Sequence, residues 1–380
     1  MFTMILFLAN QIGGNHGNPS ANLEILISLL LTQERVGIIY FSRNPIPKTI
    51  DGKKIPRPTL DFSFKKWPPF EKHIQDLVKR LKRQQIRLLI SNDCAFHNLF
   101  KFRIFKLLPN LRKIERVILT QIQTKHYRFP IPKEELLKRL GEYDHFVTTS
   151  KNVIAEWRSF GLKTKHAHSV GNCCNESETE NLVKVNKGDL RKKLGLPQNE
   201  FISVCVATLQ TRKNQKLIID NASWFRKNFP SDLFYFIGGI SDFGGQDIVD
   251  QIQSPKNEDN LKLVGEVEQA IPYIRAADLL ILPSLAEVLP ISILEAMALR
   301  TPVLASNVGG VSELINHKEN GFYFNVSNNE EFLECYAHLR KNGRLRSRFA
   351  EISYNKYHAQ FSRKCHEKLW SKLMKEICNN

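Results

Sequence analysis

Residues 283–315 read PSLAEVLPISILEAMALRTPVLASNVGGVSELI, and their pattern is the most specific evidence for a fold class in this chain. Its pattern predicts the end of a buried strand, a loop that holds Glu287, and a helix that begins near Ile291. A second strand follows and runs through a turn at Gly309-Gly310 into another helix. Strands and helices in this order are the repeating unit of a parallel sheet covered by helices.

The same alternation continues on both sides of this stretch. Short apolar runs, each a candidate buried strand, are separated by helical patterns along most of the chain. Such alternation predicts mostly parallel sheets with helices on both faces. The predicted strands are residues 5–9, 37–42, 87–91, 116–120, 145–150, 201–207, 233–239, 261–265, 279–284, 302–306 and 321–324.

A polar stretch, residues 171–189, interrupts the alternation and lacks periodic apolar positions. We interpret it as a linker between an N-terminal domain, 1–170, and a C-terminal domain, 190–354, with a helical segment, 355–380, at the end. The sequence thus predicts an α/β protein of two doubly wound, Rossmann-like domains that face each other across a cleft. In such sheets ligands bind at the carboxyl ends of the strands.

The composition excludes several classes of protein. The chain has 380 residues, of which 42% are apolar and 24% charged, the balance of a globular protein and not of a disordered or multi-span membrane protein. No apolar run reaches the roughly 20 residues that a membrane-spanning helix needs. Seven scattered cysteines without a C-x-x-C pair favour reduced thiols in a cytoplasmic compartment over a disulfide framework or a zinc site.

The net charge of +17 is unevenly distributed. Residues 1–170 hold 29 Lys and Arg against 13 Asp and Glu, whereas residues 171–380 hold 26 against 25. A positive field attracts anionic lipid, nucleic acid or phosphorylated substrates. Aromatic and cationic residues are also interleaved in segments 60–70 and 96–108, as on a surface that enters lipid headgroups, although 96–108 also fits a core helix. We expect an anionic membrane surface as a partner and no nucleic acid, because no nucleic-acid-binding motif is visible.

The stretch 283–315 also combines two carboxylates with two helix starts. Free N–H groups at a helix N-terminus attract anions, and the carboxylates of Glu287 and Glu295 accept hydrogen bonds from hydroxyl groups. The combination suits a ligand that carries both phosphates and hydroxyls. Other interpretations stay open, because Ser292 and Glu295 have the spacing of a capping box and Glu287 also fits a solvated loop residue.

As a whole, the stretch resembles the donor motif of retaining GT-B glycosyltransferases of family 4. The resemblance extends over the C-terminal half, where residues 206–222 are similar to the family's phosphate-binding segment and VGEV, 264–267, to its base-binding turn. In the N-terminal half it covers only a Gly13-Gly14 loop and residues 144–157. The residues that match the donor motif are Pro283, Ser284, Glu287, Glu295, Ala296, Met297, Ala298, Thr301, Pro302, Gly309, Gly310 and Glu313.

The resemblance implies a role for each matched position. Glu287 would contact hydroxyls of the donor sugar, Glu295 the ribose hydroxyls, and Lys213 the diphosphate. Backbone N–H groups of the loop 288–292 would add to the diphosphate site. The other positions implied for donor binding are Gly13 and Gly14, Val267, Leu289, Ile291 and Ser292.

Three departures from the family pattern bear on these roles. Pro290 removes one backbone donor from the loop. The usual phosphate-binding Arg aligns with Thr208, so Arg212 beside Lys213 is a candidate substitute. The acceptor-side His of the family has no clean match, and the candidates are His126 and His97, with Gln121 or Gln123 at the aligned position.

The resemblance further implies a retaining, metal-independent transferase that uses a UDP- or GDP-linked sugar, of the hexosyl or N-acetylhexosaminyl type. The acceptor would be a glycan or a lipid-linked glycan in the synthesis of cell-surface polysaccharide or glycolipid. We expect a cytoplasmic protein, peripheral on the inner membrane face, whose last segment, 355–380, returns to the first domain. The alternative is a non-catalytic nucleotide-sugar-binding or membrane-docking protein of the same fold.

Overall fold

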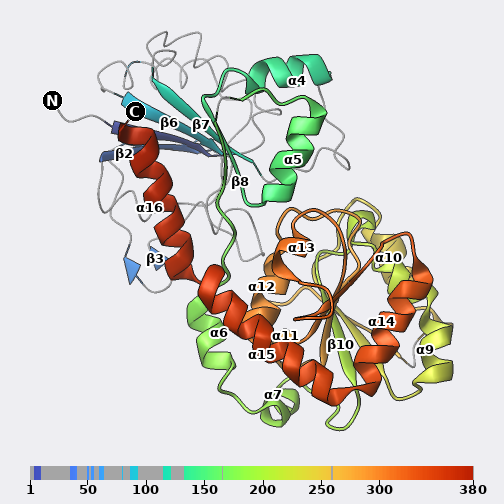
Figure 1. Cartoon of the computed structure of the whole chain (residues 1–380). Helices are drawn as coiled ribbons and strands as arrows, with labels where there is room; N and C mark the ends of the chain where they lie inside the picture. The colour runs from blue at the N-terminus through green and yellow to red at the C-terminus, as the bar shows by residue number, and fades with distance from the viewer. Residues whose placement is uncertain are drawn as a thin grey trace. The chain divides into compact units, whose positions relative to one another are not determined.

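The computed structural model describes residues 4–9, 35–40, 49–50, 53–54, 60–63, 79, 86–92, 114–120, 132–164, 166–257 and 260–379. Its chain forms two compact units (Figure 1). Unit 1 comprises residues 1–171 together with 366–380, and unit 2 comprises residues 172–365.

The sheet of unit 1 has seven parallel strands in the order β5-β2-β1-β6-β7-β8-β9. A short antiparallel hairpin, β3–β4, and the helices α4 and α5 also belong to this unit. The bounds are β1 Met4–Ala9, β2 Arg35–Tyr40, β3 Thr49–Ile50, β4 Lys53–Lys54, β5 Leu60–Ser63, β6 Ile86–Asn92, β7 Glu115–Leu119, α4 Lys133–Leu140, β8 His145–Thr148, α5 Lys151–Phe160 and β9 His166–Ser169.

The last helix, α16 (Arg363–Asn379), packs on the sheet of unit 1, as its place beside β2 and β6 in Figure 1 also shows. Four of its apolar side chains are buried in one cluster with residues of β1, β2, β6, β7 and β8. They are Trp370, Leu373, Met374 and Ile377. The C-terminal segment therefore completes the core of the N-terminal unit.

The sheet of unit 2 has six parallel strands in the order β12-β11-β10-β13-β14-β15. From β10, the strands β11 and β12 follow toward one edge of the sheet, and from β13, the strands β14 and β15 follow toward the other edge. The direction in which the chain winds across the sheet therefore reverses between β10 and β13. The bounds are β10 Ile202–Val206, β11 Leu233–Ile237, β12 Leu261–Gly265, β13 Leu279–Leu282, β14 Val303–Ser306 and β15 Phe322–Phe324.

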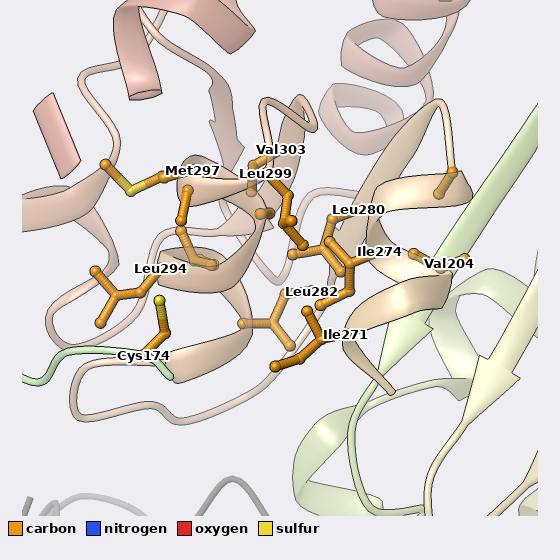
Figure 2. Packing of buried hydrophobic residues seen from close by; sticks show 14 of the residues in the cluster. Cys174, Val204, Ile271, Ile274, Leu280, Leu282, Leu294, Met297, Leu299 and Val303 are labelled. Atoms are coloured by element: carbon orange, nitrogen blue, oxygen red, sulfur yellow. The ribbon is translucent and has the colours of Figure 1, made fainter. Parts of the chain in front are cut away.

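Helices cover both faces of this sheet, because its buried residues form two separate clusters. One cluster packs α11 and α12 on the strands, and Figure 2 shows its members, among them Leu294, Met297 and Leu282. The bounds are α6 Glu176–Leu182, α7 Lys187–Lys193, α8 Lys216–Asp220, α9 Ala222–Asn228, α10 Gly245–Ile252, α11 Ile271–Ala276, α12 Ile291–Ala298, α13 Val311–Leu314, α14 Asn329–Lys341 and α15 Gly343–Gln360, with 3-10 turns η2 Thr211–Lys213 and η3 Pro255–Asn257.

The unit boundaries differ from the expected ones. Most of the stretch 171–189, expected to be a linker, lies in α6 and α7, which pack on α11 and α12 within unit 2. The packing was not evident from the sequence because both helices are short and mostly polar. Asn175 and Asn186 act as their N-caps, and a contact this short needs few apolar residues. The return to unit 1 begins at His366 and not at 355, since Tyr357 of α15 is fully buried in unit 2.

Two strands of the seven-stranded sheet, β5 and β9, were not expected from the sequence, and neither was the short hairpin β3–β4. Residues 60–63, which we assigned to a lipid-facing segment, form the edge strand β5. Strand β9 reads HAHS and has no apolar run. Its His168 Nε2 lies 3.1 Å from Nδ1 of His145 in β8, and the rings of His145 and His166 stack. The rest of segment 60–70 and the segment 96–108 lie outside the described residues. Among the described residues, no helix is long and apolar enough to cross a membrane.

Candidate functional site

The expected site residues of the C-terminal half gather at one edge of the sheet of unit 2. The segment 208–213 follows β10, and the segment 284–295 follows β13. These two strands are hydrogen-bonded neighbours, and they are the pair between which the winding reverses. In doubly wound sheets such a switch point opens a crevice at the carboxyl ends of the strands, where ligands bind.

A buried ion pair joins the two segments. Lys213 Nζ lies 2.5 Å from Glu287 Oε1, and both side chains are largely buried. Ser284 donates its hydroxyl proton to the same oxygen at 2.7 Å. Burial raises the pKa of Glu287, but the cations of Lys213 and Arg212 and the hydrogen bonds outweigh it and hold the pKa below its usual value. Glu287 is therefore an ionised carboxylate at neutral pH.

The two loops are tied to each other by further hydrogen bonds. Arg212 donates from Nη1 to the Ala286 carbonyl at 2.8 Å, and the Leu285 N–H donates to the Arg212 carbonyl at 2.8 Å. Asn214 donates its amide to the Pro283 carbonyl at 3.1 Å. These contacts hold Lys213 and Glu287 in fixed positions, as a binding site for a charged ligand requires.

Helix α12 begins directly after this loop, with Pro290 as its N-cap and no side chain that caps it. The expected capping box is therefore wrong, because Ser292 lies inside the first turn and not at the N-cap. The N–H groups of Ile291 and Ser292 stay available at the positive end of the helix. The loss of one donor at Pro290 costs little here, since a proline at the N-cap leaves the following N–H groups in place.

Glu295 lies on the same helix and is half-buried. Burial, and next the negative charge of Glu178 in α6, raise its pKa from 4.5 to about 8. In the described part of the chain no hydrogen bond to the Glu295 carboxyl group is present. The group is therefore protonated at neutral pH, and it can both donate and accept a hydrogen bond.

Replacing Glu295 with Gln should stabilise the protein at high pH. A carboxyl group whose pKa is higher in the folded than in the unfolded state keeps a proton that the unfolded chain releases, so stability falls as pH rises from about 4.5 to 8. Glu295→Gln removes this titration, and we expect the gain in stability to be about 3 kcal/mol larger at pH 8 than at pH 5. Urea unfolding at both pH values measures it.

The matched control is Glu334→Gln, which changes an exposed carboxylate of α14 in the same unit. It should leave the dependence of stability on pH unchanged. An equal gain at pH 5 and pH 8 for Glu295→Gln would contradict the raised pKa.

Two contributing residues were missed by the sequence interpretation. Asn172, 3% exposed, donates its amide to the Leu289 carbonyl at 2.6 Å, 117 positions away in the chain. Ser284 was matched to the family motif but given no role, although it bonds to Glu287. For Ser284, the only signal in the sequence was its spacing from Glu287. For Asn172, nothing in the neighbouring sequence indicated a role in the site.

The remaining expected residues are placed as follows. Thr208 is exposed, and its carbonyl accepts a hydrogen bond from Gln215 at 3.0 Å. Val267 follows β12 and packs partly buried against the apolar cluster of Figure 2, in which Leu289 is fully buried. Gly309 has φ of 52°, and the Gly310 N–H donates to the Val288 carbonyl, so this turn supports the loop. Four expected residues lie outside the described residues, namely Gly13, Gly14, His97 and His126.

Two parallel, helix-covered sheets in one chain, the second with its site at the switch point, define the GT-B fold of glycosyltransferases. The structure of Anabaena HepE in complex with UDP superposes with a TM-score of 0.77 over 100% of both chains, at 18% identity. This likeness confirms the expected fold class.

Residues 186–356 match the family model described as glycosyl transferases group 1. The UDP-Gal:alpha-D-GlcNAc-diphosphoundecaprenol alpha-1,3-galactosyltransferase of Escherichia coli is 30% identical over 162 residues, 41% of this chain and 41% of that protein. The alpha-monoglucosyldiacylglycerol synthase of Acholeplasma laidlawii is 27% identical over 189 residues, 49% of this chain and 47% of that protein. The chain spans less than half the length of these two relatives.

Proposed function

We propose that the protein is a glycosyltransferase that moves a sugar from a nucleoside-diphosphate sugar to a glycan or lipid-linked acceptor. The observation that carries this proposal is the buried pair of Lys213 and Glu287 at the switch point, beside the uncapped start of α12. Together they offer a cation and free N–H groups to a diphosphate, and a carboxylate to a sugar, from two segments that follow adjacent strands.

Lys213 acts on the leaving group. As the bond from the sugar to the diphosphate breaks, negative charge grows on the phosphate oxygens, and a fixed cation and helix N–H groups stabilise it. This cation is held in position by Glu287 and needs no reorganisation before the donor binds. Arg212, on the same 3-10 turn, adds positive charge where Thr208 offers none.

Glu287 acts on the sugar. Its Oε1 is occupied by Lys213 and Ser284, and in the described ranges 166–257 and 260–379 no hydrogen bond to Oε2 is present. That oxygen is free to accept hydroxyl protons of the donor sugar, and the ionised state of the carboxylate strengthens such bonds. Glu295, about one turn from the start of α12, accepts from the ribose hydroxyls.

The finer features of the reaction are part of the proposal. UDP is favoured over GDP as the carrier, because the Escherichia coli relative is named for UDP-Gal and Anabaena HepE was solved with UDP. The names of the two curated relatives also support a lipid-linked or lipid acceptor and a hexosyl group. We further propose retention of configuration without a metal ion, with the leaving diphosphate as the base, and a peripheral location on the inner face of a membrane.

A donor screen tests the function. We expect UDP and one UDP-sugar to raise the melting temperature of the protein, because a ligand that binds only the folded state stabilises it. The same UDP-sugar should release UDP slowly by hydrolysis and faster with a lipid-linked glycan acceptor. Stabilisation by UDP without release from any nucleotide sugar would instead favour the non-catalytic alternative, and no stabilisation by any nucleotide would contradict the donor site itself.

A further inference from the structure

The outer face of α16 carries an unusual set of charges. Four lysines of this helix are exposed, and in the part of the chain that the structure describes none of them has an ion-pair or hydrogen-bond partner. We call them the lysine stripe: Lys364, Lys368, Lys372 and Lys375.

Helical geometry places the stripe opposite the anchored face. At about 100° per residue the four lysines fall within an arc of about 80°, and they extend over about 16 Å along the helix. The buried residues Trp370, Leu373, Met374 and Ile377 are centred on the opposite side and pack against the sheet of unit 1. The helix is thus held by one face, and the other presents a straight row of ammonium groups to solvent.

The neighbours of the stripe do not neutralise it. Two carboxylates of the helix, Glu367 and Glu376, lie on its two flanks and not within it. Leu369, 42% exposed, lies about 60° outside the arc of the stripe and beyond Glu376, so the stripe itself is purely cationic. A row of exposed cations on one helix face is what anionic lipid headgroups attract.

We propose that the lysine stripe of α16 is the surface by which the protein docks on an anionic lipid bilayer. The lysine stripe would be the surface responsible for the peripheral membrane location proposed above, and its role does not depend on the transfer reaction. Charge complementarity favours this occupant, because residues 1–170, with which α16 packs, hold most of the excess positive charge of the chain. Single-stranded nucleic acid is less suitable, since the aromatic residue of this helix, Trp370, is buried and cannot stack on bases.

Vesicle co-sedimentation of the full chain tests the surface. The stripe variant is K364Q/K368Q/K372Q/K375Q, in which glutamine retains helix propensity and removes charge. The matched control is K184Q/K193Q/K227Q/K256Q, which removes the same charge from exposed lysines of unit 2. Vesicles of neutral phosphatidylcholine and of phosphatidylcholine with about a third of phosphatidylglycerol are compared at low and high salt.

We expect wild type to bind anionic vesicles at low salt and to dissociate at high salt. Because each lysine near such a surface contributes a roughly fivefold gain, the loss of all four should weaken binding by several hundredfold, whereas the control variant should bind within about threefold of wild type. An unchanged melting temperature and unchanged UDP release with a water-soluble acceptor verify that the stripe variant is folded and that the donor site is intact.

Three outcomes would overturn the inference. The first is equal binding of wild type and the stripe variant to anionic vesicles. The second is equal binding of wild type to neutral and anionic vesicles. The third is a stripe-dependent affinity for duplex DNA that exceeds the affinity for anionic vesicles, which would make nucleic acid the partner. Failure of the donor screen, by contrast, would leave vesicle binding unaffected.

Discussion

Replacing Glu287 with Gln is expected to lower turnover by a factor of about 100 to 1,000, the scale on which one preorganised polar contact acts in a transition state. The substitution keeps the size of the side chain but removes the charge that Lys213 and Ser284 hold in place. Lys213→Ala should weaken UDP binding by about 1.5–3 kcal/mol, the range for a hydrogen bond to a charged group. Steady-state UDP release and calorimetric titration with UDP measure the two effects.

The chain offers a control pair of the same chemistry. Lys216 and Asp220 on the neighbouring helix α8 form an ion pair of 2.7 Å, but both side chains are more than half exposed. An exposed pair of this kind contributes little, so Asp220→Asn and Lys216→Ala should leave turnover and UDP affinity unchanged. Wild-type turnover in Glu287→Gln together with wild-type UDP affinity in Lys213→Ala would remove the assigned donor site.

The second large effect is expected in the last helix, where Trp370→Ala should destabilise unit 1 by about 3–5 kcal/mol. Trp370 is 5% exposed and packs in the cluster of β1, β2 and β6. Its indole N–H donates to Nε2 of His366 at 3.0 Å, and Nδ1 of His366 lies 2.6 Å from the Gly171 carbonyl. Truncation leaves both a cavity and an unsatisfied imidazole nitrogen.

Hydrogen exchange followed by mass spectrometry identifies which part of the protein loses stability in Trp370→Ala. Peptides that contain β1 and β6 should exchange faster in Trp370→Ala, although they lie about 280 or more residues from the substitution in the sequence. Peptides of β10 and β13 in unit 2 should be unaffected. The control is Leu369→Ala, the adjacent but exposed position, which should change exchange very little. Unchanged exchange in β1 and β6 would show that α16 does not stabilise unit 1.

Much of the fold could be predicted because parallel strands buried on both faces are continuous apolar runs. Strand β13 reads LLIL and β10 reads ISVCV, and both lie where the sequence placed them. Strand β9 could not be predicted, because HAHS is stabilised by ring stacking and a hydrogen bond to His145, which is more than 20 positions upstream. The packing of α6 was missed for a related reason: its partners in α11 and α12 are remote in the sequence.

For the site, the residue types and their order could be read from the sequence, since the donor motif lies within 33 consecutive positions, 283–315. The chemical states of these residues depend on how the chain folds. Glu287 is ionised because Lys213, 74 positions away, is brought to 2.5 Å by the pairing of β10 with β13. Glu295, eight positions further along the same motif, is protonated because burial and the charge of Glu178 act on it. Burial and the charges of residues distant in the sequence are not set by the local sequence. These two factors give the two glutamates different protonation states.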